Sequence, residues 1–190
     1  LALISDSGTP IISDPGSDLV QVCSVENIKV FSIPGPSSPI ASIVLSDFSK
    51  TAFSFRGFIP REKKHITQEI TLMKANDSPT IFFESPKRII KTLKIILNNY
   101  ENCKVTFIRE LTKKNEEVIN TTIQDLIEIL EKREKIYGEI TLIIEPLTNQ
   151  NKITLSKKEI MKVSEKLSKD GLSVSEISKT ISEDFNISKR

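Results

Sequence analysis

The sequence predicts an α/β protein with two α/β domains and a short helical tail. Two observations carry this prediction. Short apolar runs at residues 1–5 and 28–33 are each followed by a loop rich in glycine and proline and then by a stretch with helical spacing. Between residues 51 and 148, further strand-like runs alternate with amphipathic stretches. Such alternation is typical of sheets that are covered by helices.

The first domain is expected over residues 1–50. Leu19 and Cys23 are spaced as on one helical face, which predicts a helix over residues 16–26. A second helix is expected at residues 40–45, after the loop IPGPSSP. Strand, loop and helix repeated in this order favour a parallel sheet, and ligands of such sheets bind at the carboxyl ends of the strands.

The second domain is expected over residues 51–148 as a mixed sheet with helices. The aromatic and basic stretch FSFRGFIPREKK contains the linker and the first strand. Pro86 is suited to start a helix, because proline is favoured in the first helical turn, and the apolar residues that follow share one face. We expect strands at 80–85, 104–111, 118–121 and 138–146, and helices at 62–74, from residue 86 and at 123–134.

A third region, residues 154–190, is expected to form a helical tail. Ser156 and Glu159 fit a capping box, Gly171 fits a helix end, and Ser173 or Ser175 fits the start of a second helix. Two short helices and the start of a third resemble a truncated helix-turn-helix. A helical tail that only packs against the protein is the alternative.

Composition excludes several classes of protein. The 190 residues include no apolar run of eighteen, so no transmembrane helix is expected. The two cysteines lie eighty residues apart in apolar contexts and the chain has a single histidine, so we expect a reduced, cytoplasmic protein without a metal site. The net charge of +2 gives no argument for nucleic-acid binding by itself.

The loop after the first apolar run is a candidate ligand site. It holds two aspartates, two glycines and two prolines in the eleven residues from Asp6 to Gly16. Gly8 permits positive φ and close approach of a ligand to the backbone, while Asp6 can accept hydrogen bonds from a hydroxyl or amino group. Gly16 opens a helix, whose N-terminus favours anions. The alternative is a purely structural turn.

The loop at residues 33–39 has the same design one strand later. Ser37 and Ser38 offer hydroxyl groups at the start of the following helix, where N-capping is their alternative role. Two such loops on neighbouring parallel strands favour one shared ligand of nucleotide size.

Six motifs in order over residues 3–146 resemble successive motifs of the bacterial ribosomal RNA small subunit methyltransferase I family: LISDSGTPIISDPGSDLV, IPGPSS, GFIPREKK, FFESPKRI, RELTK and GEITLIIE. The resemblance implies the tetrapyrrole-methylase fold, S-adenosylmethionine as the cofactor, and 2′-O-methylation of a cytidine ribose in 16S ribosomal RNA. It also implies a homodimer that acts on the small (30S) ribosomal subunit. The family's first strands would lie upstream of Leu1 and its last helix beyond Arg190, which implies an incomplete enzyme.

The resemblance also assigns cofactor contacts. In the first domain these are the two loops, and in the second domain they are three apolar residues that close over the adenosine. Because an apolar residue in a strand is by default part of the core, core packing is the alternative for these three. The implied cofactor residues are Asp6, Gly8, Thr9, Pro10, Ser37, Ser38, Phe83, Leu111 and Ile140.

Methyl transfer to a ribose hydroxyl requires alignment of the reacting atoms and removal of a proton, a task for a carboxylate or a neutral lysine. Glu110 and Glu84 end strands of the second domain beside basic residues, so either is a candidate base, with Lys113 as a further catalytic candidate. Arg88 and Arg109 are expected on RNA phosphates. Ion pairs at strand ends are the structural alternative for each of these residues.

Basic residues form clusters in the second domain, and an RNA substrate would need them for phosphate neutralisation. The first cluster contains Arg56, Arg61, Lys63 and Lys64, and solvated surface side chains are the alternative for it. Three alternatives to the RNA methyltransferase remain: a methylase of a tetrapyrrole or other small acceptor, a non-catalytic helix-turn-helix RNA-binding module, and, least favoured, a dinucleotide oxidoreductase. The last lacks the expected glycine fingerprint.

Overall fold

A computed structural model describes residues 1–48 and 52–147, together with scattered positions between 161 and 178. The chain divides into two compact units, Leu1–Leu147 and Thr148–Arg190, which we describe separately. The boundary expected between residues 50 and 51 falls inside the first unit and stays a prediction.

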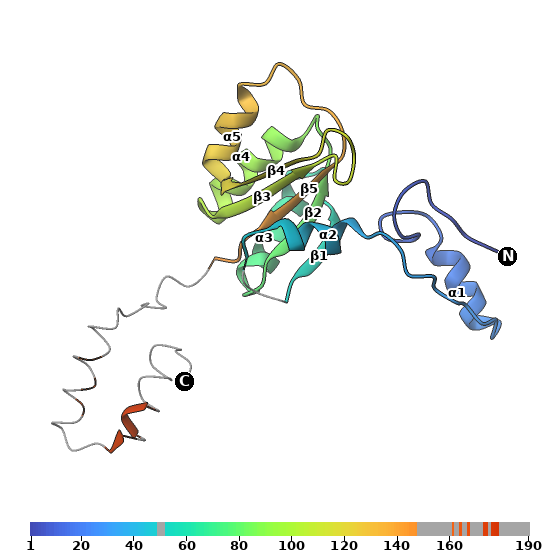
Figure 1. Cartoon of the computed structure of the whole chain (residues 1–190), viewed down its shortest axis with the longest axis horizontal. Coiled ribbons are helices and arrows are strands. Elements are labelled where there is room, and N and C mark those ends of the chain that lie inside the picture. Colours follow the sequence, from blue (N-terminus) through green and yellow to red (C-terminus); the bar gives the residue numbers. More distant parts are fainter. Residues whose placement is uncertain are drawn as a thin grey trace. The chain divides into compact units, whose positions relative to one another are not determined.

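A mixed five-stranded sheet forms the centre of the first unit, as far as its residues are described (Figure 1). Its strands lie in the order β1-β2-β5-β3-β4. β1 runs parallel to β2, whereas the other neighbours are antiparallel. The mixed sheet predicted for residues 51–148 is therefore confirmed. The strands are β1 (Ser54–Phe58), β2 (Thr80–Glu84), β3 (Lys104–Arg109), β4 (Glu117–Thr122) and β5 (Ile140–Ile144).

Three amphipathic helices contribute to the main core on one face of the sheet: α3 (Lys63–Lys74), α4 (Ile89–Tyr100) and α5 (Ile123–Glu131). Their buried positions recur at helical spacing, so each helix presents an apolar stripe to the strands. Alternate residues of the strands complete this core, among them Phe82, Phe107 and Leu142. Thr122 caps α5 by accepting a hydrogen bond from Asp125 N at 3.2 Å.

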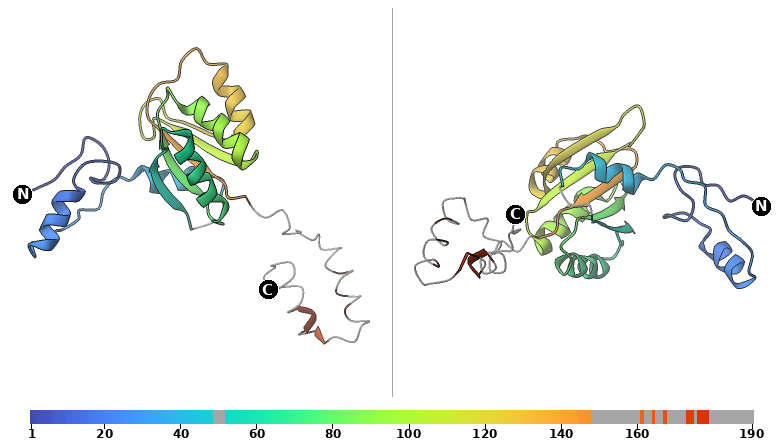
Figure 2. Two further views of the ribbon diagram at one scale, coloured as in Figure 1. Left: turned by 180° about the vertical axis from the view of Figure 1, so that it is seen from behind. Right: turned by 60° about the horizontal axis from the view of Figure 1, so that its bottom comes forward.

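The opposite face of the sheet is partly covered by α2 (Ser38–Leu45), which the right-hand view of Figure 2 shows on the side of the strands away from α3. A smaller cluster of Ile81, Ile108 and Ile143 lies on this face, with Ile43 packed against it. Hydrogen bonds link the sheet to the end of α2. The Thr106 hydroxyl donates to Asn120 Oδ1 at 2.5 Å, and Asn120 Nδ2 donates to the Leu45 carbonyl at 3.4 Å.

The first 48 residues form two helices but no strand. The predicted helix at 16–26 is confirmed as α1 (Ser17–Val25) and the one at 40–45 as α2. The strands predicted at residues 1–5 and 28–33 are wrong, because both runs have irregular backbone. A strand requires a neighbour for its N–H and C=O groups, and no described strand lies beside these runs.

Only part of the predicted tail falls on described residues. Of the helix expected from Ser156, Met161, Ser164 and Leu167 are described and are helical, whereas its start lies outside the described residues. The turn at Gly171 and the third helix also lie outside them. The predicted helix start at Ser173 is confirmed. Glu176 N donates to Ser173 Oγ at 3.4 Å, and Ser173 N donates to the Glu176 carboxylate at 2.9 Å, which together form a capping box. The helix-turn-helix itself stays a prediction.

Candidate functional site

The loop at residues 6–16 has an unusual backbone. Gly8, Ile11, Ser13 and Gly16 all adopt positive φ, with Ile11 at 76°. Positive φ is costly for a β-branched residue, and such conformations concentrate at ligand sites. Gly16 adopts φ 128°, which L side chains rarely adopt, and a Cβ atom there would also lie 2.5 Å from Leu3 Cδ2, so this position favours glycine.

The structure brings the two predicted cofactor loops together. Thr9 Oγ1 donates a hydrogen bond to the Pro36 carbonyl at 2.9 Å, and the Gly8 backbone lies beside the same oxygen. Asp6 is exposed, and no described hydrogen bond or ion pair engages its carboxylate. Ser37 is the N-cap residue of α2, but its hydroxyl makes no capping bond. The joined loops therefore leave polar groups open to a ligand.

The remaining cofactor candidates of the first domain differ in burial. Pro10 is half-buried between the two glycines of its loop, and Ser38 is half-buried as the first residue of α2. Neither side chain makes a described contact that assigns it a structural role. Both residues stay predictions as cofactor contacts.

All four motif segments of the second domain meet at one edge of the sheet. Glu84 at the end of β2 pairs with Ile140 at the start of β5, which pairs in turn with Arg109 at the end of β3. Phe58 at the end of β1 pairs with Phe83 one residue earlier on β2. Motifs separated by up to eighty residues are thus neighbours in space.

Glu110 is the centre of a network at this edge. Its N–H donates to the Glu139 carbonyl at 2.9 Å, and its Oε1 accepts the Glu139 N–H at 2.9 Å. Lys113 Nζ donates to the carboxylates of both Glu110 and Glu139 at 3.1 Å. Glu110 adopts φ 53°, and a Cβ at Gly138 would lie 2.5 Å from Glu110 Oε1. The carboxylate is therefore fixed by a loop that requires glycine opposite it.

The electrostatic environment favours the ionised forms of Glu110 and Lys113. The Glu139 N–H and then Lys113 lower the pKa of Glu110, and the carboxylates of Glu139 and Glu110 raise the pKa of Lys113. Lys113 is therefore a cation near neutral pH and is poorly suited to act as a neutral base. Glu110 is the better candidate to accept a proton, with Lys113 as its positioning partner.

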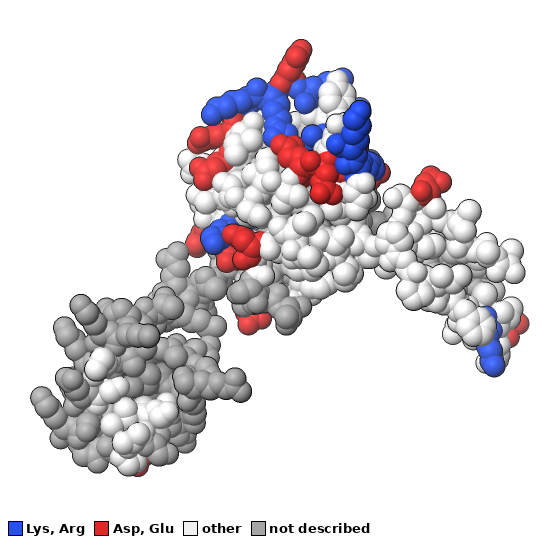
Figure 3. All heavy atoms as spheres, in the orientation of Figure 1, with Lys and Arg blue, Asp and Glu red and all other residues white. Residues whose placement is uncertain are grey.

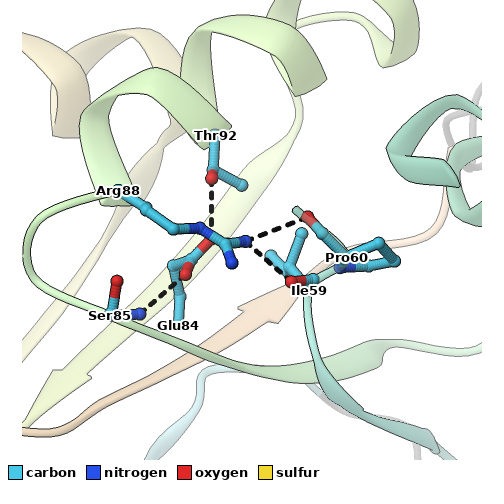
Figure 4. A network of polar contacts seen from close by, with 6 residues as sticks. All are labelled: Ile59, Pro60, Glu84, Ser85, Arg88 and Thr92. Atoms are coloured by element: carbon cyan, nitrogen blue, oxygen red, sulfur yellow. Dashed lines mark hydrogen bonds and ion pairs between the residues drawn. The ribbon is translucent and has the colours of Figure 1, made fainter. Parts of the chain in front are cut away.

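Glu84 lies in a buried network that Figure 4 shows. Its carboxylate accepts hydrogen bonds from the Ser85 N–H at 2.7 Å, Thr92 Oγ1 at 2.6 Å and Arg88 Nη2 at 3.0 Å. Arg88 Nη2 also donates to the carbonyls of Ile59 and Pro60 at 2.7 and 2.9 Å. The Glu84 side chain is 0% exposed. These contacts favour the structural alternative for both Glu84 and Arg88, which join β1, β2 and α4.

Arg109 also has structural partners. Its Nε donates to Glu117 Oε2 at 3.0 Å, and Arg133 donates to both oxygens of the same carboxylate. The two guanidinium groups, Arg133 above all, lower the pKa of Glu117 to about 2. This cluster ties β3 and β4 to the segment after α5, which favours the ion-pair alternative for Arg109.

The first basic cluster is differently placed. Arg56 donates from Nε and Nη2 to the carboxylate of Glu69 in α3, at 2.8 and 3.0 Å, so it has a structural partner. Arg61, Lys63 and Lys64 are exposed, and no described ion pair or side-chain hydrogen bond engages their cationic groups. They precede and open α3, directly after β1. The face of the molecule in Figure 3 shows another gathering of basic side chains, mixed with acidic ones, around α5 and the loop after β3. Of the predicted phosphate contacts, the cluster before α3 is the best suited.

Three apolar residues were predicted to contact the adenosine. Phe83 is half-buried on the α2 side of the sheet, in edge-to-face contact with Phe55 and Phe58. Leu111 is half-buried against the smaller cluster on that same side. Ile140 is 3% exposed and belongs to the core beneath the helices, so only its backbone is open to a ligand.

Two features of the site have no counterpart in the sequence predictions. Gly138, which permits the position of Glu110, was treated only as part of a strand motif. Phe58 was treated only as part of the stretch that contains the linker and the first strand, although its aromatic side chain is 60% exposed. The signal for both was a glycine beside a functional side chain at a strand end, where positive φ and close approach are common requirements.

Metal clusters and membrane-spanning helices are both absent from the described part of the chain. No group of three or more histidine, cysteine, aspartate or glutamate side chains is arranged to hold a metal ion there. No helix among those residues is long and apolar enough to cross a membrane. Cys23 and Cys103 are both free, and burial raises the pKa of the Cys103 thiol to about 12.

Comparison with known proteins defines the family. The profile of the tetrapyrrole (corrin/porphyrin) methylases matches residues 1–127. Three relatives are named ribosomal RNA small subunit methyltransferase I. The protein from Hydrogenobaculum is 42% identical over 76% of this chain and 62% of its own length, and that from Thermotoga maritima is 37% identical over 76% and 64%. The protein from Synechocystis is 30% identical over 100% of this chain and 68% of its own length.

The chain therefore belongs to the tetrapyrrole methylase family, and within it to the group whose members are named ribosomal RNA small subunit methyltransferase I. It spans less than two thirds of the length of the first two relatives. Solved structures agree on the fold. The methyltransferase CobJ matches with a TM-score of 0.56 at 13% identity, over 75% of this chain and 63% of CobJ. A diphthine synthase matches with 0.56 at 15% identity, over 73% and 57%. The predicted α/β fold of tetrapyrrole-methylase type is confirmed.

Proposed function

We propose that the protein to which this chain belongs transfers a methyl group from S-adenosylmethionine to a ribose 2′-oxygen of a cytidine in small-subunit ribosomal RNA. The observation that carries the proposal is the meeting of four motif segments at one sheet edge, around the fixed Glu110 carboxylate. The names of the relatives support ribosomal RNA as the substrate. We further propose that it acts as a homodimer on the 30S subunit, in the cytoplasm.

The joined loops at residues 6–16 and 33–39 fit a small polar cofactor. Thr9 fixes one loop to the other, Gly8 leaves its backbone open to close approach, and Asp6 and Ser37 have polar groups without described partners. Asp6 would accept hydrogen bonds from hydroxyl or amino groups of the cofactor. S-adenosylmethionine supplies an electrophilic methyl group on a sulfonium centre. Phe83 and Leu111 would add apolar contacts from the second domain.

Glu110 would accept the proton of the ribose hydroxyl. The Glu139 N–H and Lys113 hold its carboxylate in one orientation, and they keep it ionised near neutral pH. A low pKa makes a weak base, so we expect Glu110 to act mainly by orienting the hydroxyl and receiving its proton late in the transfer. Lys113 maintains this orientation. Arg61, Lys63 and Lys64 would neutralise phosphates of the substrate.

The decisive experiment supplies the protein with radiolabelled S-adenosylmethionine and unmethylated small ribosomal subunits. Label in an alkali-resistant dinucleotide would place the methyl group on a ribose 2′-oxygen, which is the expected result. Cofactor binding without label would contradict the proposal and favour a methylase of a small acceptor. RNA binding with neither label nor cofactor binding would favour a non-catalytic RNA-binding module.

A single substitution tests the role of Glu110. Glu110→Gln keeps the shape of the side chain but cannot accept a proton, so we expect kcat to fall by about 10²–10⁴-fold with cofactor affinity unchanged. Glu128→Gln, on the exposed side of α5, is the matched control and should retain the full rate. A Glu110→Gln enzyme with the wild-type kcat would exclude Glu110 as the proton acceptor.

A further inference from the structure

The end of β1 contains a local irregularity that changes the direction of one aromatic side chain. Phe55 pairs with Ile81, and the next pair joins Phe58 to Phe83, so β1 has one residue more than β2 between the two pairs. The extra residue is accommodated next to Gly57, which adopts φ 68°. This is a β-bulge with a glycine in the left-handed region, a device that redirects side chains next to functional sites.

The bulge decides on which side of the sheet Phe58 lies. In a regular strand side chains alternate, so Phe58 would lie opposite Phe55, beneath the helices. With the extra residue, Phe58 lies on the same face as Phe83 and contacts it edge to face, with ring centroids 5.5 Å apart. Ile59 instead enters the helix-side core and is 2% exposed. The bulge thus places a large aromatic side chain, 60% exposed, outside the core.

The surroundings of Phe58 are rigid. Phe83 also contacts Phe55 edge to face, with ring centroids 4.9 Å apart, so the Phe58 ring rests on a packed aromatic pair. Arg88 Nη2 holds the carbonyls of Ile59 and Pro60, the two residues after Phe58, as Figure 4 shows. An exposed ring whose backbone is fixed in this way loses little conformational freedom when a ligand binds.

The charge of the chain segments that follow β1 and β2 identifies the class of ligand. Arg61, Lys63 and Lys64 follow Phe58 within six residues, and Lys87 follows the end of the neighbouring strand β2. All four are exposed, and no described ion pair engages them. Glu62, the acidic residue between Arg61 and Lys63, has its carboxylate Oε2 3.8 Å from His65 Nδ1. An exposed aromatic ring that is followed in the chain by cations without a described ion pair fits single-stranded nucleic acid, whose bases stack and whose phosphates need neutralisation.

We propose that Phe58 is a stacking platform for an unpaired base of the RNA substrate, with Arg61, Lys63 and Lys64 on the adjoining phosphates. The identity of the ligand as RNA rests on the proposed function. Phe58 is a binding residue in this proposal, and takes no part in the transfer of the methyl group.

The test measures two affinities of the protein for each variant: that for a short fluorescein-labelled single-stranded RNA, by anisotropy, and that for S-adenosylhomocysteine, by calorimetry. Because Phe58→Ala removes the ring on which a base would stack, we expect this variant to raise the Kd for RNA by roughly 5- to 150-fold. Phe58→Trp should bind RNA within about twofold of wild type, whereas Phe58→Leu should lose most of the gain from stacking. Affinity for S-adenosylhomocysteine should not change.

Leu72→Ala is the matched control, because Leu72 is a 53% exposed apolar residue of α3 and its removal should leave the RNA Kd unchanged. The platform would be overturned if Phe58→Ala or Phe58→Leu bound RNA with the wild-type Kd. It would also be overturned if Phe58→Ala bound S-adenosylhomocysteine more weakly than wild type, or if the assembly formed by Phe58→Ala differed from wild type in mass on sedimentation. The last two would identify a cofactor contact and a subunit contact.

The same measurements separate this proposal from the proposed function. Phe58-dependent RNA binding without any methyl transfer would support the platform and contradict the methyltransferase. Methyl transfer with an RNA Kd that is independent of Phe58 would do the reverse. Failure of the wild-type protein to bind RNA at all would contradict both.

Discussion

Residues 1–48 and residues 52–147 have similar sequence patterns but different degrees of burial. Both contain apolar runs, turn motifs and helices with an apolar face. In the second region the strands and helices enclose a continuous core, with Phe107, Leu126 and Leu142 fully buried. In the first region only Pro39 and Ser42 are buried, and α1 has no buried residue.

The difference teaches that an apolar run forms a strand only where a neighbour is present to pair with it. Both residues 140–144 and residues 28–33 are apolar runs: the first contains three isoleucines and a leucine, and the second contains two isoleucines, a valine and a phenylalanine. The former lie between β2 and β3 and are buried throughout. In the latter, Phe31 is 83% and Ile33 is 88% exposed. Hydrophobicity gives the tendency, and strand pairing decides the result.

The largest effect that would sharpen this comparison comes from paired phenylalanine substitutions. Phe107→Ala removes a fully buried ring from the main core and should lower the free energy of unfolding by about 3–5 kcal/mol. Phe31→Ala removes an exposed ring and should change it by less than about 0.5 kcal/mol. Urea denaturation followed by circular dichroism measures both. A large loss in Phe31→Ala would mean that residues 28–33 are buried in solution, and the comparison would break down.

A second pair of substitutions compares the polar contacts of the two regions, and we expect it to change the free energy of unfolding somewhat less. Glu84→Ala leaves the Arg88 guanidinium without its carboxylate and should destabilise the protein by about 3 kcal/mol. Thr9→Ala removes an exposed hydrogen bond to Pro36 and should cost about 0.5 kcal/mol. Equal costs in the same denaturation assay would contradict the structural role that burial gives to the Glu84 network.

The sequence predicts most of the second region because its local signals agree with its tertiary contacts. The helix starting near Pro86 has apolar residues on one face, and this face packs on the sheet in α4. The weak run at 118–121 becomes β4 because β3 provides a partner along its whole length. The strands at 1–5 and 28–33 were predicted from local hydrophobicity, which does not report whether another strand pairs with these residues.

For the candidate site, the sequence indicates which motifs matter but not how each side chain is used. Glu84 and Glu110 have the same pattern, a glutamate at a strand end beside basic residues. Their environments differ, because Glu84 is buried under α4 and Glu110 is fixed in a loop opposite Gly138. The exposed position of Phe58 could not be predicted from the sequence for a related reason. One extra residue in β1 reverses the alternation of side chains on which such a prediction depends.

The smallest predicted effect is a dependence of the free energy of unfolding on pH. We expect it in the second region, because no described ion pair has both partners within residues 1–48. Arg133 and Arg109 lower the pKa of Glu117 from 4.5 to about 2 in the folded protein. A carboxyl group with a lowered folded-state pKa stabilises the protein above pH 4.5, and this contribution is lost as the pH falls from 4.5 towards 2. With allowance for solvent screening, it amounts to about 1–2 kcal/mol at neutral pH.

Glu117→Gln should therefore be less stable than wild type at pH 7 by about 1–2 kcal/mol, with a difference that shrinks as the pH approaches 2, because both side chains are then neutral. Urea denaturation at a series of pH values measures the two curves. Glu128→Gln, which removes an exposed carboxylate without a described partner, should follow the wild-type curve. Wild-type and Glu117→Gln curves that stay parallel down to pH 2 would mean that the two arginines do not hold this carboxylate in solution. The ion-pair cluster would then not tie the segment after α5 to the strands, and Arg109 would again be available as a phosphate ligand.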